Sequence, residues 1–207
     1  MNKKFYERFW EGDSDRLGDF DLKWPILSPL IPRGSGISVL DFGCGKGEII
    51  GEMRKLNPGA KYFGADVSEA AIDFASGKYA GVDFVKIEDG GQLPFADNSF
   101  DFIFTSEVIE HVYDTENAFR EMARVLKPGG ELLLTCPYHG FIKNLNLVLF
   151  GFDRHFDPTG PHVRFFSKKT LGRCLLAAGL QPIRWGHYGR FYPVPHSIFV
   201  VAKKNET

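Results

Sequence analysis

Short apolar runs alternate with segments of helical period through most of the chain. Seven apolar runs bounded by turn residues predict β-strands at residues 38–43, 61–66, 82–87, 100–106, 131–137, 182–189 and 197–203. Segments of helical period fall between them, at residues 47–57, 68–79, 113–126 and 167–180. Such alternation is typical of a parallel sheet with helices on its faces. The pattern therefore predicts an α/β fold.

Polar and turn residues mark the ends of these predicted helices. Ser68 and Ser167 stand where a side-chain oxygen caps a first helical turn, and Gly179 stands where a helix ends. The sequence KPGG at 127–130 ends the third helix, because Pro128 blocks its continuation and the glycine pair turns the chain into the next strand.

Two segments do not fit simple alternation. Residues 1–36 precede the first strand, and Trp10, Phe20 and Trp24 indicate a flap that packs on the body. Residues 137–166 are too long for an ordinary connection, and such long loops are usually functional or disordered. Because this insert is rich in aromatic residues and histidine, we expect it to be ordered, with a cover helix at 141–152.

Composition narrows the class of protein. The chain has 207 residues, which suits one domain over residues 1–207, and its 25 basic and 26 acidic residues give no global field to attract nucleic acid. No apolar run is long enough to span a bilayer, so we expect no integral membrane segment and a cytoplasmic location. Three cysteines without a paired spacing indicate neither a disulfide framework nor a thiolate metal site.

The sequence VLDFGCGKGEI at 39–49 is typical of a nucleotide-binding loop. Its glycines are Gly43, Gly45 and Gly47, whereas the dinucleotide fingerprint has its third glycine at the next position, which here is Glu48. In an open α/β sheet this first loop lies at the carboxyl ends of the strands, where ligands bind. The loop therefore predicts a ligand site but argues against a dinucleotide.

Acidic residues after the next two strands point to an adenosine ligand. Asp66 ends the second strand, where a carboxylate can bind both hydroxyls of a ribose. Val67 would then lie against the adenine face, and Asp89, with the amide of Gly90 beside it, near the adenine edge.

Four segments together resemble one family. VLDFGCGKGEI, FGADVSEAAIDFA, LPFADNSFDFIFTSEVIEHV and RVLKPGGELLLTCP have the order and spacing of class I S-adenosylmethionine-dependent methyltransferases, and they are most similar to the methyltransferase type 11 group. The resemblance covers residues 37–137. It implies a Rossmann-like three-layer sandwich with a seven-stranded, mostly parallel sheet whose last strand is antiparallel. It also implies S-adenosylmethionine as the cofactor.

The resemblance also implies roles for individual residues. Asp41 would face the amino end of the methionine part of the cofactor, and the loop of Gly43, Cys44 and Gly45 would approach the methionine and ribose. Asp66 would hold the ribose, while Val67, Asp89 and Gly90 would contact adenine. Ser106 and Glu107, with Thr105, would close the floor beneath the methionine part.

The acceptor side is less clearly marked. Candidate bases are His111, His139, His155 and His162, and we expect the catalytic role for His139, because it follows the fifth strand. His155, Phe141 and Arg164 of the insert are predicted substrate contacts, with Arg154 as a second possible anion ligand. His155, Asp157 and His162 have irregular spacing that a loop hydrogen-bond network explains equally well, so no metal site is predicted.

Three functions follow from these observations. The first is methyl transfer to a small, partly apolar acceptor, and the second is a catalytically silent domain that binds the cofactor or a partner protein. An NAD-dependent oxidoreductase is third, and Glu48 in place of the third glycine argues against it. A nucleic-acid acceptor is disfavoured by the charge balance and by SEVI at 106–109, where nucleic-acid methyltransferases have an Asn/Asp-Pro-Pro-Tyr type motif.

Overall fold

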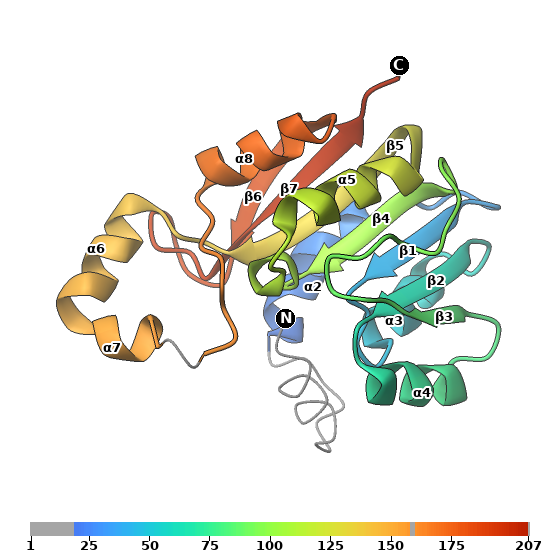
Figure 1. Ribbon diagram of the computed structural model, residues 1–207, viewed down its shortest axis with the longest axis horizontal. Helices are drawn as coiled ribbons and strands as arrows, with labels where there is room; N and C mark the ends of the chain where they lie inside the picture. The colour runs from blue at the N-terminus through green and yellow to red at the C-terminus, as the bar shows by residue number, and fades with distance from the viewer. Residues whose placement is uncertain (1–18, 158–159, 207) are drawn as a thin grey trace.

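A seven-stranded sheet with helices on both faces forms the body of the protein (Figure 1). The computed structural model describes residues 19–157 and 160–206, so the predicted packing of Trp10 lies outside the described residues. The helices and strands, in chain order, are α2 (Phe20–Leu27), η1 (Ser28–Leu30), β1 (Ser38–Phe42), α3 (Glu48–Leu56), β2 (Lys61–Asp66), α4 (Glu69–Lys78), β3 (Asp83–Lys86), β4 (Phe100–Ser106), η2 (Ile109–His111), α5 (Thr115–Val125), β5 (Leu126–Pro137), α6 (Phe141–Phe150), α7 (Phe152–His155), α8 (Lys168–Ala177), β6 (Leu180–Tyr188) and β7 (Ser197–Lys204).

The strand order is β3-β2-β1-β4-β5-β7-β6, and neighbouring strands from β3 to β5 are parallel. β7 pairs antiparallel with both β5 and β6, which confirms the predicted antiparallel last strand. The chain leaves β1 on one side through β2 and returns on its other side with β4. The carboxyl ends of β1 and β4 therefore form a switch point, where α/β proteins bind ligands.

Alternating side chains of the central strands supply two apolar cores, one on each face of the sheet. Leu132 and Leu134 of β5 are completely buried on one face, whereas Leu133 is completely buried on the other. The first face is covered by α5 and α8, which lie in front of the sheet in Figure 1, and the second face by α2 and α3 behind it. These two layers of helices complete the predicted three-layer sandwich.

The predicted helix ends are largely confirmed. The Ser68 hydroxyl accepts a hydrogen bond from the Ala71 amide, and Ser167 forms a reciprocal capping box with Thr170. Residues 127–130 differ from the prediction, because β5 already begins at Leu126 and this stretch is a bulge within the strand. The helix still ends immediately before it, at Val125.

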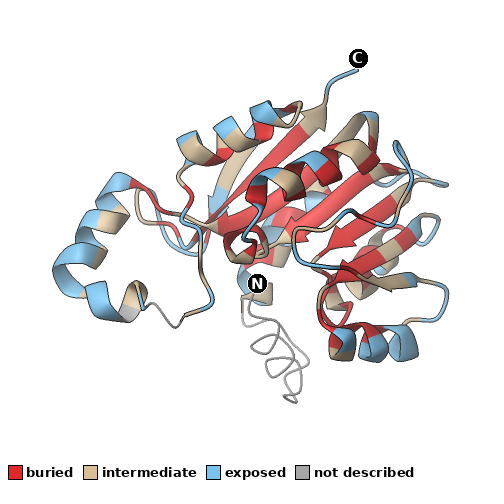
Figure 2. Cartoon of the chain, viewed as in Figure 1, coloured by how far each residue is buried: buried red, intermediate tan, exposed pale blue. Residues whose placement is uncertain are grey.

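The insert at 137–166 contains the predicted helix. α6 and the short α7 project beyond the sheet and are mostly exposed, as Figure 2 shows. Phe141 and Phe150, at the two ends of α6, are 82% and 81% exposed. Among the described helices, none has both the length and the apolar character needed to cross a bilayer.

Candidate functional site

A cavity of about 950 Å³ opens at the carboxyl ends of β1, β2 and β4. Its walls come from the loops that follow the first four strands, from α2, from the insert, and from the loop between β6 and β7, which contributes Arg190, Pro195 and His196. Ten of the residues predicted to bind the cofactor line this one cavity: Asp41, Gly43, Cys44, Gly45, Asp66, Val67, Asp89, Gly90, Ser106 and Glu107. Thr105, also predicted for the floor, is buried in β4 and is absent from the described lining. The sheet topology thus brings together residues from four separate segments of the sequence.

The glycine loop after β1 is held against the end of β2. The Gly45 amide donates to Asp66 Oδ2 at 2.9 Å, and the Ser68 amide donates to Asp66 Oδ1 at 2.9 Å. These contacts fix the orientation of the Asp66 carboxylate at the cavity wall. Gly43 has φ of 79°, and a Cβ atom there would overlap the side chain of Val108. The loop conformation therefore requires glycine at this position.

Asp41 is a buried carboxyl group on the cavity wall. Its Oδ2 atom has no hydrogen-bond partner among the described residues. Burial raises the pKa of Asp41 to about 8, and the nearby Asp66 carboxylate adds to the rise while Lys23 opposes it. A cationic ligand group would satisfy this oxygen and favour its charged form.

Glu107 lies at the centre of a buried polar network on the cavity floor. Its Oε1 accepts hydrogen bonds from the hydroxyls of Thr135 and Tyr188, both at 2.8 Å, and its Oε2 accepts one from Ser197 at 3.1 Å. These three donors come from the adjacent strands β5, β6 and β7. Burial raises the pKa of Glu107, and the hydrogen bonds from Thr135 and Tyr188 oppose that rise.

The sequence analysis missed a lysine contributed by α2. Lys23 is 1% exposed and lines the cavity, with its Nζ 3.0 Å from Ser106 Oγ and 3.1 Å from Asp19 Oδ1. It places a positive charge beside the expected position of the methionine part of the cofactor. No local pattern around Lys23 distinguishes it from a surface lysine.

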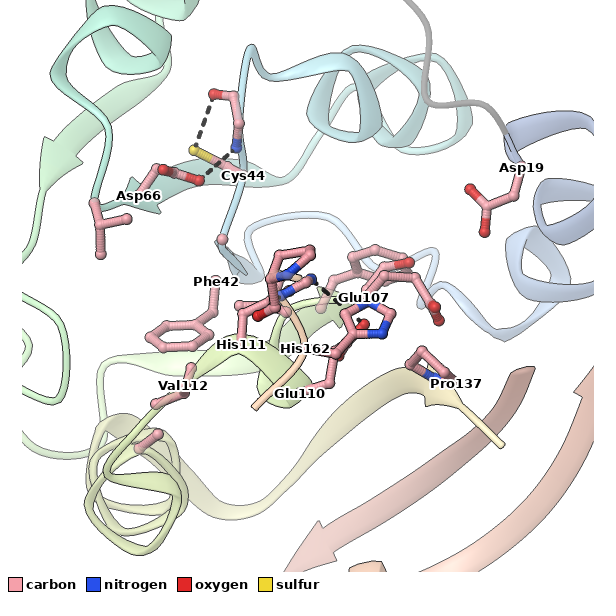
Figure 3. A pocket seen from close by; sticks show the side chains of 18 of the residues that line it. Asp19, Phe42, Cys44, Asp66, Glu107, Glu110, His111, Val112, Pro137 and His162 are labelled. Carbon is pink, nitrogen blue, oxygen red and sulfur yellow. Dashed lines mark hydrogen bonds and ion pairs between the residues drawn. The ribbon is translucent and has the colours of Figure 1, made fainter. Parts of the chain in front are cut away.

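A second set of ionisable side chains lines the same cavity. Glu110 and His111 belong to η2, and His162 belongs to the insert, and their candidate ligand atoms lie within 4.8 Å of one another (Figure 3). Burial, followed by the effect of Glu107, raises the pKa of Glu110 well above its ordinary value. Burial lowers the pKa of His111, and burial together with His111 lowers the pKa of His162 to about 4. Both imidazoles are therefore neutral at pH 7.

Of the four residues predicted to act on the acceptor side, the structure places one on the cavity and three away from its described lining. His155 lines the cavity, whereas His139, Phe141 and Arg164 are absent from its described lining. His139 is buried behind the wall, with Nδ1 3.0 Å from Asn144 Oδ1, and burial lowers its pKa to about 4. Arg164 donates instead to the Tyr113 carbonyl at 2.6 Å, and Phe141 faces solvent.

Comparisons with known proteins agree with this geometry. The model of a family described as "Methyltransferase domain" matches residues 40–134. The chain is 36% identical over 191 residues to a ubiquinone/menaquinone biosynthesis C-methyltransferase of Desulfotalea psychrophila, covering 83% of this chain and 76% of that protein. It is 33% identical over 155 residues to a ubiquinone biosynthesis O-methyltransferase of Chelativorans, covering 70% and 59%.

Other curated relatives are longer than this chain. The matches to two of them cover only 33% and 50% of the relative's own length. Among solved structures, a putative methyltransferase of Haloferax volcanii, in complex with the activator Trm112, matches with a TM-score of 0.79 at 20% identity, covering 97% of both chains. This likeness confirms the fold.

Proposed function

The chain belongs to the S-adenosylmethionine-dependent methyltransferases, and from this premise we propose that it transfers a methyl group to a small, partly apolar acceptor. Its cofactor is S-adenosylmethionine. The observation that carries the proposal is the convergence of ten predicted cofactor residues on one cavity. At about 950 Å³, this cavity is at the upper end of the usual range for ligand pockets, which leaves room for an acceptor beside the cofactor.

The lining residues fit the cofactor chemically. Asp66 would accept hydrogen bonds from the ribose hydroxyls, while Asp89 and the Gly90 amide would bind the adenine edge. The buried Oδ2 of Asp41 lacks a hydrogen-bond partner among the described residues, and the ammonium group of the cofactor would supply one. Lys23 would balance the carboxylate of the methionine part. The bound cofactor supplies a methyl group on a sulfonium centre that is already a good leaving group.

The acceptor would occupy the part of the cavity bounded by the insert. Leu147 and Phe150 of α6 line the cavity with Pro137, and Pro137 lies across it from Asp66 in Figure 3. Apolar walls of this kind favour an acceptor with a hydrophobic portion. The net charge of −1 disfavours a nucleic-acid acceptor, although one relative is named a tRNA methyltransferase.

The protein's main contribution would be orientation and exclusion of water, since the leaving group comes with the cofactor. His155 is the insert histidine that we propose as a substrate contact. Burial lowers its pKa, so the imidazole is neutral at pH 7, and its Nε2 has no hydrogen-bond partner among the described residues. The buried His139 would support His155 from behind, because the centroids of the two imidazole rings lie 5.2 Å apart.

Calorimetry with S-adenosylhomocysteine tests the cofactor assignment. The wild type should bind, and Asp66→Asn should weaken binding by at least about tenfold, because charge-assisted hydrogen bonds contribute about 1.5–3 kcal/mol each. Asp83→Asn is the matched control, since Asp83 is an exposed carboxylate at the start of β3. Absence of binding by the wild type would contradict the proposal.

A panel of small acceptors with S-adenosylmethionine, read by mass spectrometry, tests the transfer itself. A product 14 mass units heavier than its acceptor, the increment of one CH₂ that any methyl transfer gives, supports methyl transfer. Cofactor binding without transfer to any member of a broad panel would favour the catalytically silent domain. Methylation of RNA in place of the small acceptors would refute the proposed acceptor class while leaving the cofactor site intact.

A further inference from the structure

Glu110, His111 and His162 form a cluster on the cavity wall that the proposed methyl transfer does not use. Figure 3 shows the three side chains gathered together, away from Asp66 and Cys44 at the glycine loop. The backbone holds this arrangement, because the Glu110 carbonyl accepts the amides of Val163 at 2.9 Å and Arg164 at 3.0 Å. The insert is thus tied to η2 immediately beside His162.

The hydrogen bonds of His111 determine where its lone pair lies. Its Nδ1 atom is 3.0 Å from the Pro161 carbonyl oxygen, which can only accept. Nδ1 must therefore carry the proton, and in the neutral ring the lone pair lies on Nε2. That Nε2 is 3.7 Å from Glu110 Oε1. When Glu110 is ionised, two acceptors therefore face each other, at a separation too long for a direct hydrogen bond.

Glu110 makes this arrangement costly unless something binds between the groups. Its side chain is almost fully buried, and neither carboxylate oxygen has a hydrogen-bond partner among the described residues. A buried carboxylate of this kind must be neutralised by a proton or by a cation. A proton on Glu110 could reach His111 only across 3.7 Å, whereas a metal ion would engage all three side chains.

We propose that Glu110, His111 and His162 bind one divalent transition-metal ion. Two imidazoles with one carboxylate favour Zn²⁺ or a neighbouring first-row ion over Mg²⁺, which prefers oxygen ligands alone. The hydrogen bond from His111 to Pro161 is the kind of outer-shell contact that orients a histidine ligand. Bonds of about 2.0–2.2 Å would draw the three ligand atoms closer than their present limit of 4.8 Å.

Three protein ligands leave at least one coordination position open. Because all three residues line the cavity, that position would be accessible to a ligand in the cavity. The site goes beyond the proposed methyl transfer, since metal binding can be measured without cofactor or acceptor. A failure of the metal proposal therefore leaves the methyltransferase proposal unaffected.

The experiment uses the full chain, freed of metal by a chelator that is then removed. Zn²⁺ calorimetry should give one ion per chain, and Co²⁺ should give visible d–d absorption bands in the intensity range of a low-coordinate nitrogen and oxygen site. Glu110→Gln and His162→Ala should each weaken Zn²⁺ binding by at least about 100-fold, since even outer-shell changes cost about 10–100-fold. His187→Ala removes an exposed imidazole on β6 and should bind Zn²⁺ like the wild type.

Three results would overturn the proposal. They are no Zn²⁺ binding by the wild type, unchanged binding by His162→Ala, or loss of binding on His155→Ala with His162→Ala unaffected. The last result would place the ion at the neighbouring pair His139 and His155, whose Nε2 atoms are also buried without hydrogen-bond partners among the described residues. Melting curves of the metal-free variants verify folding, and His162→Ala decides the test if Glu110→Gln does not fold.

Discussion

Replacing Tyr188 by phenylalanine removes one hydroxyl from the network around Glu107. Tyr188 is 2% exposed, and its hydroxyl donates to Glu107 Oε1 at 2.8 Å. The variant keeps the ring and its packing, while Thr135 and Ser197 still donate to the carboxylate. A hydrogen bond to a charged group contributes about 1.5–3 kcal/mol. We therefore expect the free energy of unfolding at pH 7 to fall by about 2 kcal/mol.

The size of this loss should depend on pH. Because burial raises the pKa of Glu107 in the folded protein, its ionisation lowers stability as pH rises above the ordinary value of 4.5. Loss of the Tyr188 donor raises that pKa further, so the variant loses more stability above the folded pKa than in acid. Below the folded pKa the hydrogen bond joins neutral groups and contributes only about 0.5–1.5 kcal/mol.

Urea unfolding monitored by circular dichroism at several pH values measures this effect. Tyr192→Phe is the matched control, since Tyr192 is 68% exposed, and its free energy of unfolding should stay within about 0.5 kcal/mol of the wild type. Equal stability of Tyr188→Phe and wild type at pH 7, or a difference that grows in acid, would refute this account of the network.

Three further changes test other parts of the structure. Gly43→Ala should lower the free energy of unfolding by about 1–3 kcal/mol and weaken S-adenosylhomocysteine binding in calorimetry, because φ at Gly43 is 79° and the new methyl group overlaps Val108. The control is Gly77→Ala in α4, which should leave the free energy of unfolding unchanged or raise it by up to about 1 kcal/mol. Arg124→Met should cost about 2–4 kcal/mol at pH 7 in urea unfolding, since it removes the partner that, more than any other group, lowers the pKa of Glu121. That loss should be complete above about pH 4.5 and shrink as pH falls through the lowered pKa, so a pH-independent loss would contradict it. Phe150→Ser should leave the free energy of unfolding within about 0.5 kcal/mol of the wild type, because Phe150 is 81% exposed. The same change should raise the KM for the acceptor in steady-state assays, because Phe150 lines the cavity, and an unchanged KM would exclude Phe150 from the acceptor site.

The cofactor side of the cavity was predictable because its signals are local. Asp66 and Asp89 each follow a short apolar run, and in a parallel sheet the ends of neighbouring strands meet at one edge. Correct strands and their direction were therefore sufficient to place these carboxylates on the same cavity. The glycine loop adds its own local signal, since Gly43 requires a positive φ.

The rest of the site depends on contacts between distant parts of the sequence. Ser197 donates to Glu107 across 90 positions, and Lys23 reaches Ser106 across 83. The two members of each pair are too far apart in the sequence for a local pattern to contain both. Each contact can be predicted only once the strand order is known. His139 shows the same limit, since its place after β5 does not reveal that its amide bonds to the Phe166 carbonyl at 2.8 Å and holds the residue behind the wall.

The cofactor end and the acceptor end of the cavity are therefore formed by different kinds of segment. The cofactor end comes from loops fixed directly by the sheet, whereas the acceptor end depends on the insert, which is attached to η2 by the amides of Val163 and Arg164 on the Glu110 carbonyl. Because the insert makes few buried contacts of its own, changes in α6 can alter the acceptor space without disturbing the sheet. Glu110 joins the two ends, since its backbone anchors the insert while its carboxylate faces His111 and His162. Occupation of that cluster by a metal ion would then tighten the insert against the cofactor end as well as supply an open coordination position to the acceptor.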